Sequence, residues 1–304
     1  MRVFWKKKIP SGAKILAYEK SCYNEIYVTE DGPKREMWFR KKEDFFLQSR
    51  INIREPDDLV LIYSKMMVAA LLLNPMPKRI LLIGLGGGTL SNFMNRLYPQ
   101  AFIDVVEIDR KVIDLAKKFF NLNEKSNYRV HQEDGRRFAQ NMLGKGAYDL
   151  IYLDAFKSGS IPFHLKTNEF YKDIAGILSP KGVIGSNLYG KSNSLKPNDW
   201  KTFSSQFKRI YCFEDYKNVA TILLATNREE TWVLNDFNNA ATNFHTRLSF
   251  SLKDIAATYR AEKFKDDNGD ILKDDFLKEN LDRAIEKNNM DDTQCHLYPI
   301  KNCQ

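Results

Sequence analysis

The chain has 304 residues, of which 43% are hydrophobic and 28% charged, with 15 glycines and 10 prolines. This composition excludes a disordered or collagen-like chain, and the length allows one large α/β domain with additions, or two domains. The formal net charge of +8 suits acidic partners. The basic residues are spread along the chain, however, so nucleic acid is not an expected partner.

Residues 14–40 hold β-rich runs with a turn at Asp31-Gly32-Pro33, which predicts a small antiparallel sheet. A polar stretch over 46–58 then leads into an apolar run over 59–75. Lys65, near the centre of that run, would cost about 2.5–3.5 kcal/mol in a bilayer. The run is therefore predicted to be a buried helix, and no membrane partner is expected.

From residue 79 onwards, strands and helices alternate. Five apolar strands are predicted at RILLIGLGGG, AFIDVVEID, YRVHQEDG, YDLIYLDAF and GVIGSNL. This alternation is typical of a doubly wound, Rossmann-like α/β fold with a mostly parallel sheet. Two further β-rich runs after residue 197 predict a C-terminal antiparallel hairpin on the same sheet.

We expect three parts in the chain, each with its own role. They are an N-terminal β-sheet segment (1–55), a Rossmann-like nucleoside-binding catalytic domain (56–230) and a helical, charged C-terminal extension (231–304).

The cysteines bear on compartment and metal binding. Cys22, Cys212, Cys295 and Cys303 lie far apart, which implies no disulfide framework and fits a cytoplasmic protein. Cys295-His296 with Cys303 lacks CxxC spacing and a fourth ligand nearby, so no metal site is expected.

A glycine-rich loop is the strongest functional signal. Gly84, Gly86 and Gly88 directly follow the strand ILLI and precede a helix, where glycines let the backbone turn sharply and approach a ligand. Glu107 ends the second strand about 20 residues later, where a carboxylate accepts hydrogen bonds from ribose hydroxyls. The pattern predicts a nucleoside site.

Polar residues at the next two strand ends extend this site. Asp134-Gly135 follows the third strand and Asp154 ends the fourth, and ligands of open α/β sheets bind outside these carboxyl ends. An acid at the third strand end suits an adenine amino group, which favours an S-adenosylmethionine-type ligand over NAD. His164, in the loop after Asp154, borders the same crevice and is a further candidate.

With these motifs, residues 14–226 resemble the spermidine synthase (polyamine aminopropyltransferase) family, in its spermidine-synthase-like bacterial branch. The resemblance rests on Gln48, Tyr63, IGLGGG, VEIDRKVIDLAKKFF, EDGRRF, and YDLIYLDAF with Pro162 after it. It implies a class I methyltransferase-type fold, a homodimer using the N-terminal sheet, and no prosthetic group. The donor substrate would be decarboxylated or ordinary S-adenosylmethionine, the acceptor an amine, and the nucleoside product methylthioadenosine.

The resemblance also implies roles for individual residues. Gln48, Glu107 and Asp134-Gly135 would hold the methylthioadenosine part of the donor, and Pro162 would contact the adenine side. Asp154 would accept the proton of the attacking amine. Tyr63 would place either a substrate or that acid.

The departures from the family pattern concern the acceptor. The family has Asp inside the glycine loop and a second Asp three residues after the catalytic one, where this chain has Gly87 and Lys157. Ser64 and Lys65 replace the His or Gln and the acid that follow the family tyrosine. We therefore expect an aminopropyl transferase with an atypical acceptor site. Two alternatives stay open: a small-molecule methyltransferase, and a non-catalytic nucleoside-binding protein.

Overall fold

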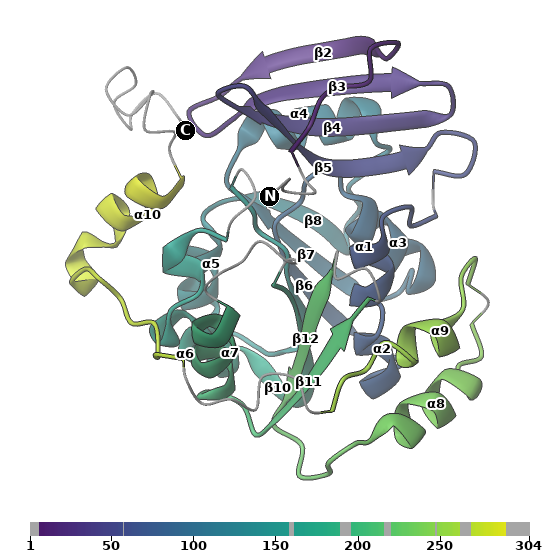
Figure 1. Ribbon diagram of the computed structural model, residues 1–304. Coiled ribbons are helices and arrows are strands. Elements are labelled where there is room, and N and C mark those ends of the chain that lie inside the picture. The colour runs from purple at the N-terminus through teal and green to yellow at the C-terminus, as the bar shows by residue number, and fades with distance from the viewer. Residues whose placement is uncertain are drawn as a thin grey trace.

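The computed structural model describes residues 6–56, 58–157, 161–188, 196–215, 220–246, 248–261 and 269–289. Its N-terminal part is an antiparallel sheet with the strand order β1-β5-β4-β3-β2. The five strands are β1 (Lys6–Lys7), β2 (Lys14–Lys20), β3 (Glu25–Asp31), β4 (Lys34–Lys41) and β5 (Asp44–Asn52). Figure 1 shows this sheet, in purple, lying above the central sheet of the molecule.

The sequence prediction was wrong for β5, because residues 46–58 were predicted to be a polar stretch and not to contain a strand. Residues 44–52 alternate between the two faces of the sheet, so that Leu47, Ser49 and Ile51 are buried while the intervening side chains are half-buried. Alternation of this kind is a strand signal even where the outward residues are polar. The strand brings the Ser49 hydroxyl and the Gln48 carbonyl close to the glycine loop after β6.

The central sheet has seven strands in the order β11-β12-β10-β9-β6-β7-β8. The strands β8, β7, β6, β9 and β10 run parallel, and the hairpin β11–β12 joins β10 in an antiparallel sense. This confirms the predicted doubly wound fold with its C-terminal hairpin. The strands are β6 (Arg79–Ile83), β7 (Phe102–Glu107), β8 (Tyr128–Gln132), β9 (Tyr148–Leu153), β10 (Leu178–Asn187), β11 (Arg209–Glu214) and β12 (Thr221–Thr226).

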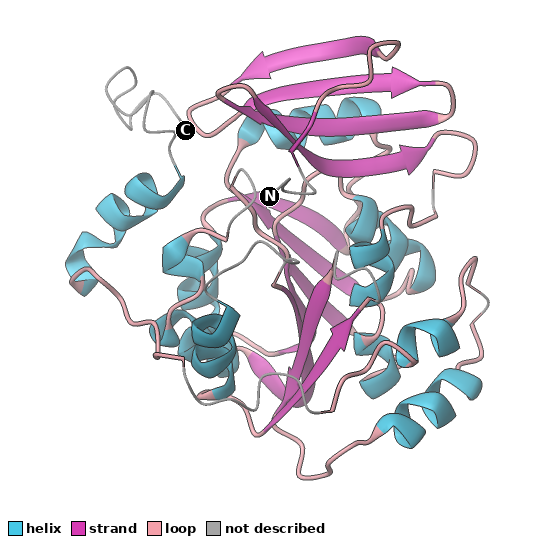
Figure 2. Ribbon diagram, viewed as in Figure 1, coloured by secondary structure: helices cyan, strands magenta, loops and turns pink. Residues whose placement is uncertain are grey.

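Helices cover both faces of this sheet (Figure 2), so its strands are apolar on both sides. Successive residues of β6 enter different cores: Ile80 and Leu82 pack on one face, and Leu81 and Ile83 on the other. The helices are α1 (Ile62–Met67), α2 (Ala70–Leu73), α3 (Thr89–Leu97), α4 (Arg110–Phe119), α5 (Gly135–Met142), α6 (Asn168–Gly176), α7 (Lys196–Ser204), α8 (Leu234–Thr242), α9 (Leu252–Ala256) and α10 (Leu281–Asn289), with short 3₁₀ helices η1 (Phe163–Leu165) and η2 (Lys278–Asn280).

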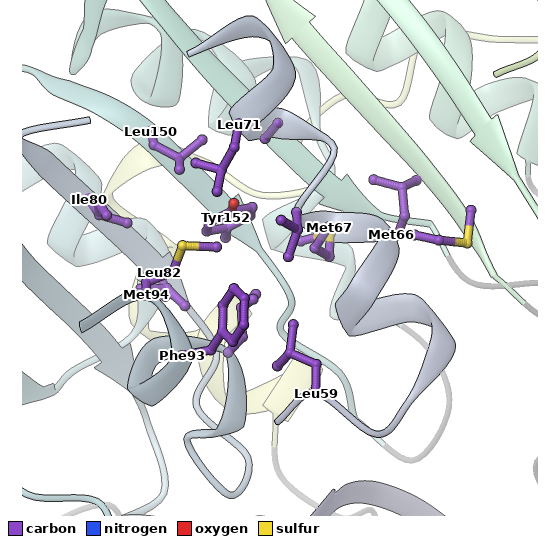
Figure 3. Packing of buried hydrophobic residues seen from close by; sticks show 14 of the residues in the cluster. Leu59, Met66, Met67, Leu71, Ile80, Leu82, Phe93, Met94, Leu150 and Tyr152 are labelled. Carbon is purple, nitrogen blue, oxygen red and sulfur yellow. The ribbon is translucent and has the colours of Figure 1, made fainter. Parts of the chain in front are cut away.

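The apolar run over 59–75 is buried, as predicted, but it forms two short helices rather than one. Val68 and Ala69 close the first helix with tighter i→i+3 hydrogen bonds to Lys65 and Met66. Figure 3 shows Met67 and Leu71 from this run beside Leu82 and Phe93. Within the described ranges, no helix is long and apolar enough to cross a bilayer.

The cysteines differ in part from the prediction. Cys22 is disulfide-bonded, whereas Cys212 is buried and is not part of a disulfide. The sequence has the wide spacing typical of reduced cysteines, and spacing alone does not reveal which distant residues the fold brings together. Cys295, His296 and Cys303, which were considered as metal ligands, lie outside the described residues.

Candidate active site

A cavity of about 1060 Å³, including its open mouth, lies between the N-terminal sheet and the carboxyl ends of the central strands. Ligands of open α/β sheets bind at this edge. Nine of the ten residues predicted from sequence line it: Gln48, Tyr63, Gly84, Gly86, Glu107, Asp134, Gly135, Asp154 and Pro162. The cavity therefore joins residues from β5, α1 and four parallel strand ends.

The glycine loop forms one wall of the cavity. Gly84 and Gly86 have φ values of 100° and 55°, which favour glycine, and a Cβ on Gly84 would overlap the backbone of Asp154. Gly88 is the tenth of these residues: it has φ 73° and stands at the N-cap of α3, and it does not line the cavity. Glycine at this position allows the turn into α3. The sequence pattern alone does not distinguish this structural role from contact with a ligand.

Glu107 faces the cavity from the end of β7 and also supports the glycine loop. One carboxylate oxygen accepts a hydrogen bond of 3.1 Å from the backbone N–H of Leu85, and the other accepts one of 3.0 Å from Asp109. Burial raises the pKa of Glu107 to about 7, although these N–H donors act in the opposite direction. The carboxylate is thus held in place before any ligand arrives.

Asp134, at the end of β8, is almost fully occupied by protein partners. Its Oδ1 caps α5 by accepting from the backbone N–H of Arg136 and Arg137, and its Oδ2 lies 2.8 Å from Nε2 of the buried His164. Burial alone would raise the pKa of Asp134, but these hydrogen bonds hold it below its ordinary value. His164 therefore holds the Asp134 carboxylate from the side away from the cavity, and it does not itself line the cavity.

Asp154 stands at the end of β9 with two polar partners. Asn187, at the end of the neighbouring strand β10, donates a hydrogen bond of 2.9 Å to its Oδ1, and Tyr63 of α1 also hydrogen-bonds to it. Burial raises the pKa of Asp154 to about 7, and both hydrogen bonds oppose that rise. Burial and the neighbouring acid also raise the pKa of Tyr63, so the phenol stays protonated and serves as a donor.

Comparisons with known proteins bear on the family of this chain. Residues 60–244 match the family model of the spermine/spermidine synthase domain. A polyamine aminopropyltransferase of Vibrio vulnificus is 32% identical over 273 residues, which cover 88% of this chain and 91% of that protein.

The chain belongs to the spermine/spermidine synthase family. It is a transferase.

Solved structures share the fold of this family member. A spermidine synthase in complex with the transition-state analogue AdoDATO has a TM-score of 0.63 and 18% identity, covering 80% of this chain and 83% of that one. Human methyltransferase-like protein 13 in complex with SAH has a TM-score of 0.56 and 26% identity, covering 61% of this chain and 91% of that one. The fold is thus common to aminopropyl and methyl transferases.

The family departures seen in the sequence fall at specific places in the structure. A Cβ on Gly87 would meet the ring of Phe120 at 2.8 Å and Cβ of Ser49 at 2.9 Å, so the space for a larger side chain is already filled. Lys157 lines the cavity. Lys65 lies outside it, with its ammonium 5.7 Å from the centre of the Phe250 ring.

Sequence reasoning missed several polar residues of the site, of which three have informative contacts or positions. Asn187 holds Asp154, and the hydroxyl of Ser49 accepts a hydrogen bond of 2.7 Å from the backbone N–H of Gly87. Asn289, at the end of α10, reaches the cavity from the C-terminal extension. Asn187 follows an apolar strand and was in principle detectable as a strand-end residue, whereas nothing in the sequence marks Asn289.

Proposed function

We propose that this transferase moves an aminopropyl group from decarboxylated S-adenosylmethionine to an amine acceptor. The observation that carries the proposal is that the Asp154 carboxylate faces the same cavity as Glu107 and Asp134. This arrangement supports a proposal in which Asp154 accepts a proton and Glu107 and Asp134 contact the nucleoside of the same ligand.

The nucleoside half of the cavity supports the binding of an adenosine-type donor. Glu107 offers carboxylate oxygens at the strand end where ribose hydroxyls bind in this class of fold. Pro162 and Gly135 line the cavity together with Asp134, which gives the adenine base a partly apolar wall to contact. Gln48 lies across from them on β5 and donates to the carbonyl of Phe46 over 3.1 Å.

The chemistry needs a base for the amine. A primary amine has a pKa near 10.4 and is protonated at neutral pH, so its nitrogen has no free electron pair. Asp154 attracts the ammonium and accepts one proton as the nitrogen attacks the carbon next to the sulfonium sulfur. The new C–N bond forms as the C–S bond breaks, and the electron pair of that bond stays on sulfur, giving methylthioadenosine.

The acceptor half supports a substrate other than a simple diamine. Gly87 stands where the family pattern has an acid, and Phe120 and Ser49 occupy the space that the acidic side chain would need. Lys157 adds a positive charge to the cavity lining, where the pattern has a second acid. Because a dication gains from each desolvated carboxylate it meets, we propose that putrescine is a poor acceptor here.

Calorimetry with the two forms of the donor tests this proposal. We expect the protein to bind decarboxylated S-adenosylmethionine more tightly than ordinary S-adenosylmethionine. Preference for the ordinary donor would favour methyl transfer instead. Binding of the decarboxylated donor without turnover of any amine would favour a non-catalytic nucleoside-binding protein. Putrescine turnover at the efficiency of an ordinary spermidine synthase would contradict the atypical acceptor site.

A further inference from the structure

The C-terminal extension returns to the active site along residues 269–289. The backbone of Leu272 is bound on both sides: its N–H donates to Oγ1 of Thr202 over 2.8 Å, and its carbonyl accepts from the N–H of Asn168 over 2.8 Å. This segment therefore lies along the ends of α6 and α7. Figure 1 shows α10, in yellow, continuing from it beside α5.

A buried ion pair fixes the segment next to the cavity. The guanidinium of Arg136 binds both oxygens of Asp274, at 2.6 and 2.7 Å, and Thr167 donates to the same carboxylate over 2.8 Å. Arg136 is 4% exposed. Arg136 also lies 3.7 Å from Asp173, but Asp274 is its bidentate partner, and because a buried charge that loses such a partner is destabilising, this contact fastens the extension to the fold. Arg136 also follows Asp134 in the first turn of α5. The contact therefore lies directly behind Asp134, at the end of the cavity that is proposed to hold the adenine.

Helix α10 then brings Asn289 into the cavity wall. Asn289 is 6% exposed and lines the cavity, with its Nδ2 3.4 Å from Oδ2 of Asp134. Among the described residues, this long contact is the only hydrogen bond of the Asn289 side chain. Asp134 itself already accepts from His164 and from two backbone N–H groups. A buried amide with spare donors and an acceptor thus stands where the acid has little capacity left.

We propose that Asn289 reads the adenine base of the donor, so that the C-terminal extension completes the nucleoside site. An asparagine amide is complementary to the N6/N7 edge of adenine, because its oxygen accepts from the exocyclic amine and its nitrogen donates to N7, whereas a 6-oxo base has acceptors at both of these positions. A 6-oxo base presents an acceptor in place of that amine and leaves the amide oxygen unpaired. The inference rests on the proposed function in one respect, namely that the ligand is an adenine nucleoside.

Calorimetry with methylthioadenosine and methylthioinosine tests this role. The parent protein should prefer methylthioadenosine. Asn289→Ala should weaken methylthioadenosine binding by about three- to tenfold, the value of one net hydrogen bond, and should lose most of the discrimination between the two nucleosides. Asn288→Ala is the matched control, since Asn288 is on the same helix and, within the described ranges, its side chain hydrogen-bonds only to the carbonyl of Ala284. It should leave both affinities unchanged.

The outcomes separate this inference from the proposed function. An Asn289→Ala variant that binds methylthioadenosine as well as the parent does would overturn the role of Asn289 alone. An equal loss for both nucleosides would also overturn it, because it would mean that Asn289 only supports the wall by packing. If the parent binds neither nucleoside, the proposed function fails and the inference with it. Circular dichroism of each variant shows that the comparison is made between folded proteins.

Discussion

Asn187 donates a hydrogen bond of 2.9 Å to the Asp154 carboxylate across the parallel pair β9–β10. The contact joins two strand ends that are 33 residues apart in sequence. It stabilises the charged form of an acid whose pKa is otherwise raised by burial. The proposed base of the reaction is therefore positioned by the sheet itself.

Removing this hydrogen bond should shift the pH dependence of the reaction. The parent should lose kcat/KM as the pH falls below about 7, because Asp154 must be deprotonated to accept the proton of the amine. Asn187→Ala should move the midpoint to higher pH. Ser186→Ala is the control, since Ser186 is the preceding residue of the same strand and lies outside the cavity. Superimposable profiles for the parent and Asn187→Ala would show that Asn187 does not tune the acid.

The raised pKa of Asp154 also makes a prediction about stability. An acid with a higher pKa in the folded state than its ordinary 3.8 binds its proton more tightly when folded, so its contribution to stability falls as pH rises toward 7. Asp154→Asn lacks this loss. We compare the free energy of unfolding of the variant with that of the parent at each pH. This difference, variant minus parent, should be about 1–3 kcal/mol larger at pH 8 than at pH 4, after a discount for solvent in the cavity.

Urea unfolding at the two pH values measures this difference. Asp114→Asn, which removes an exposed carboxylate on α4, is the control and should follow the parent at both. An Asp154→Asn variant whose stability relative to the parent is the same at pH 4 and pH 8 would show that the carboxylate is not desolvated.

Nucleoside affinity should depend on Glu107. Glu107→Ala should weaken methylthioadenosine binding by about 1–3 kcal/mol, the cost of leaving buried hydroxyls unpaired. Because the pKa of Glu107 is raised to about 7, the parent should also bind more tightly as pH rises through that value, and Glu107→Gln should lose this dependence. Calorimetry from pH 6 to pH 8 gives both results, and equal affinities in parent and mutants would remove the assignment.

The N-terminal sheet should form the interface of a homodimer. Its outward face exposes Ile15 (54%) and Tyr18 (50%), and the Tyr18 ring packs at a tilt against that of Tyr27, with 4.8 Å between the ring centres. Exposed apolar groups on a sheet are suited to association with a second copy. Light scattering should find a dimer for the parent and a monomer for Tyr18→Lys. Met76→Lys, at an 80% exposed site elsewhere, should stay dimeric; a monomeric parent contradicts the prediction.

The sequence predicted most of the cavity because its residues follow apolar strands. Glu107, Asp134 and Asp154 each end a parallel strand, and parallel strands end at one edge of a sheet. Gln48 entered through the family resemblance, while its strand β5 was read as a polar stretch. Asn289 was out of reach, because its place depends on the tertiary contact between Arg136 and Asp274. The division at residues 55 and 230 stays a prediction.

Product analysis by mass spectrometry tests the central claim most directly. The protein is incubated with a panel of amines and either decarboxylated or ordinary S-adenosylmethionine, in parallel with Asp154→Asn. We predict methylthioadenosine and an aminopropylated amine from the decarboxylated donor alone, with putrescine among the weaker acceptors. Asp154→Asn should bind methylthioadenosine normally and lose about 10²-fold or more of the rate. A methylated product formed from ordinary S-adenosylmethionine, or an undiminished rate in Asp154→Asn, would contradict the account.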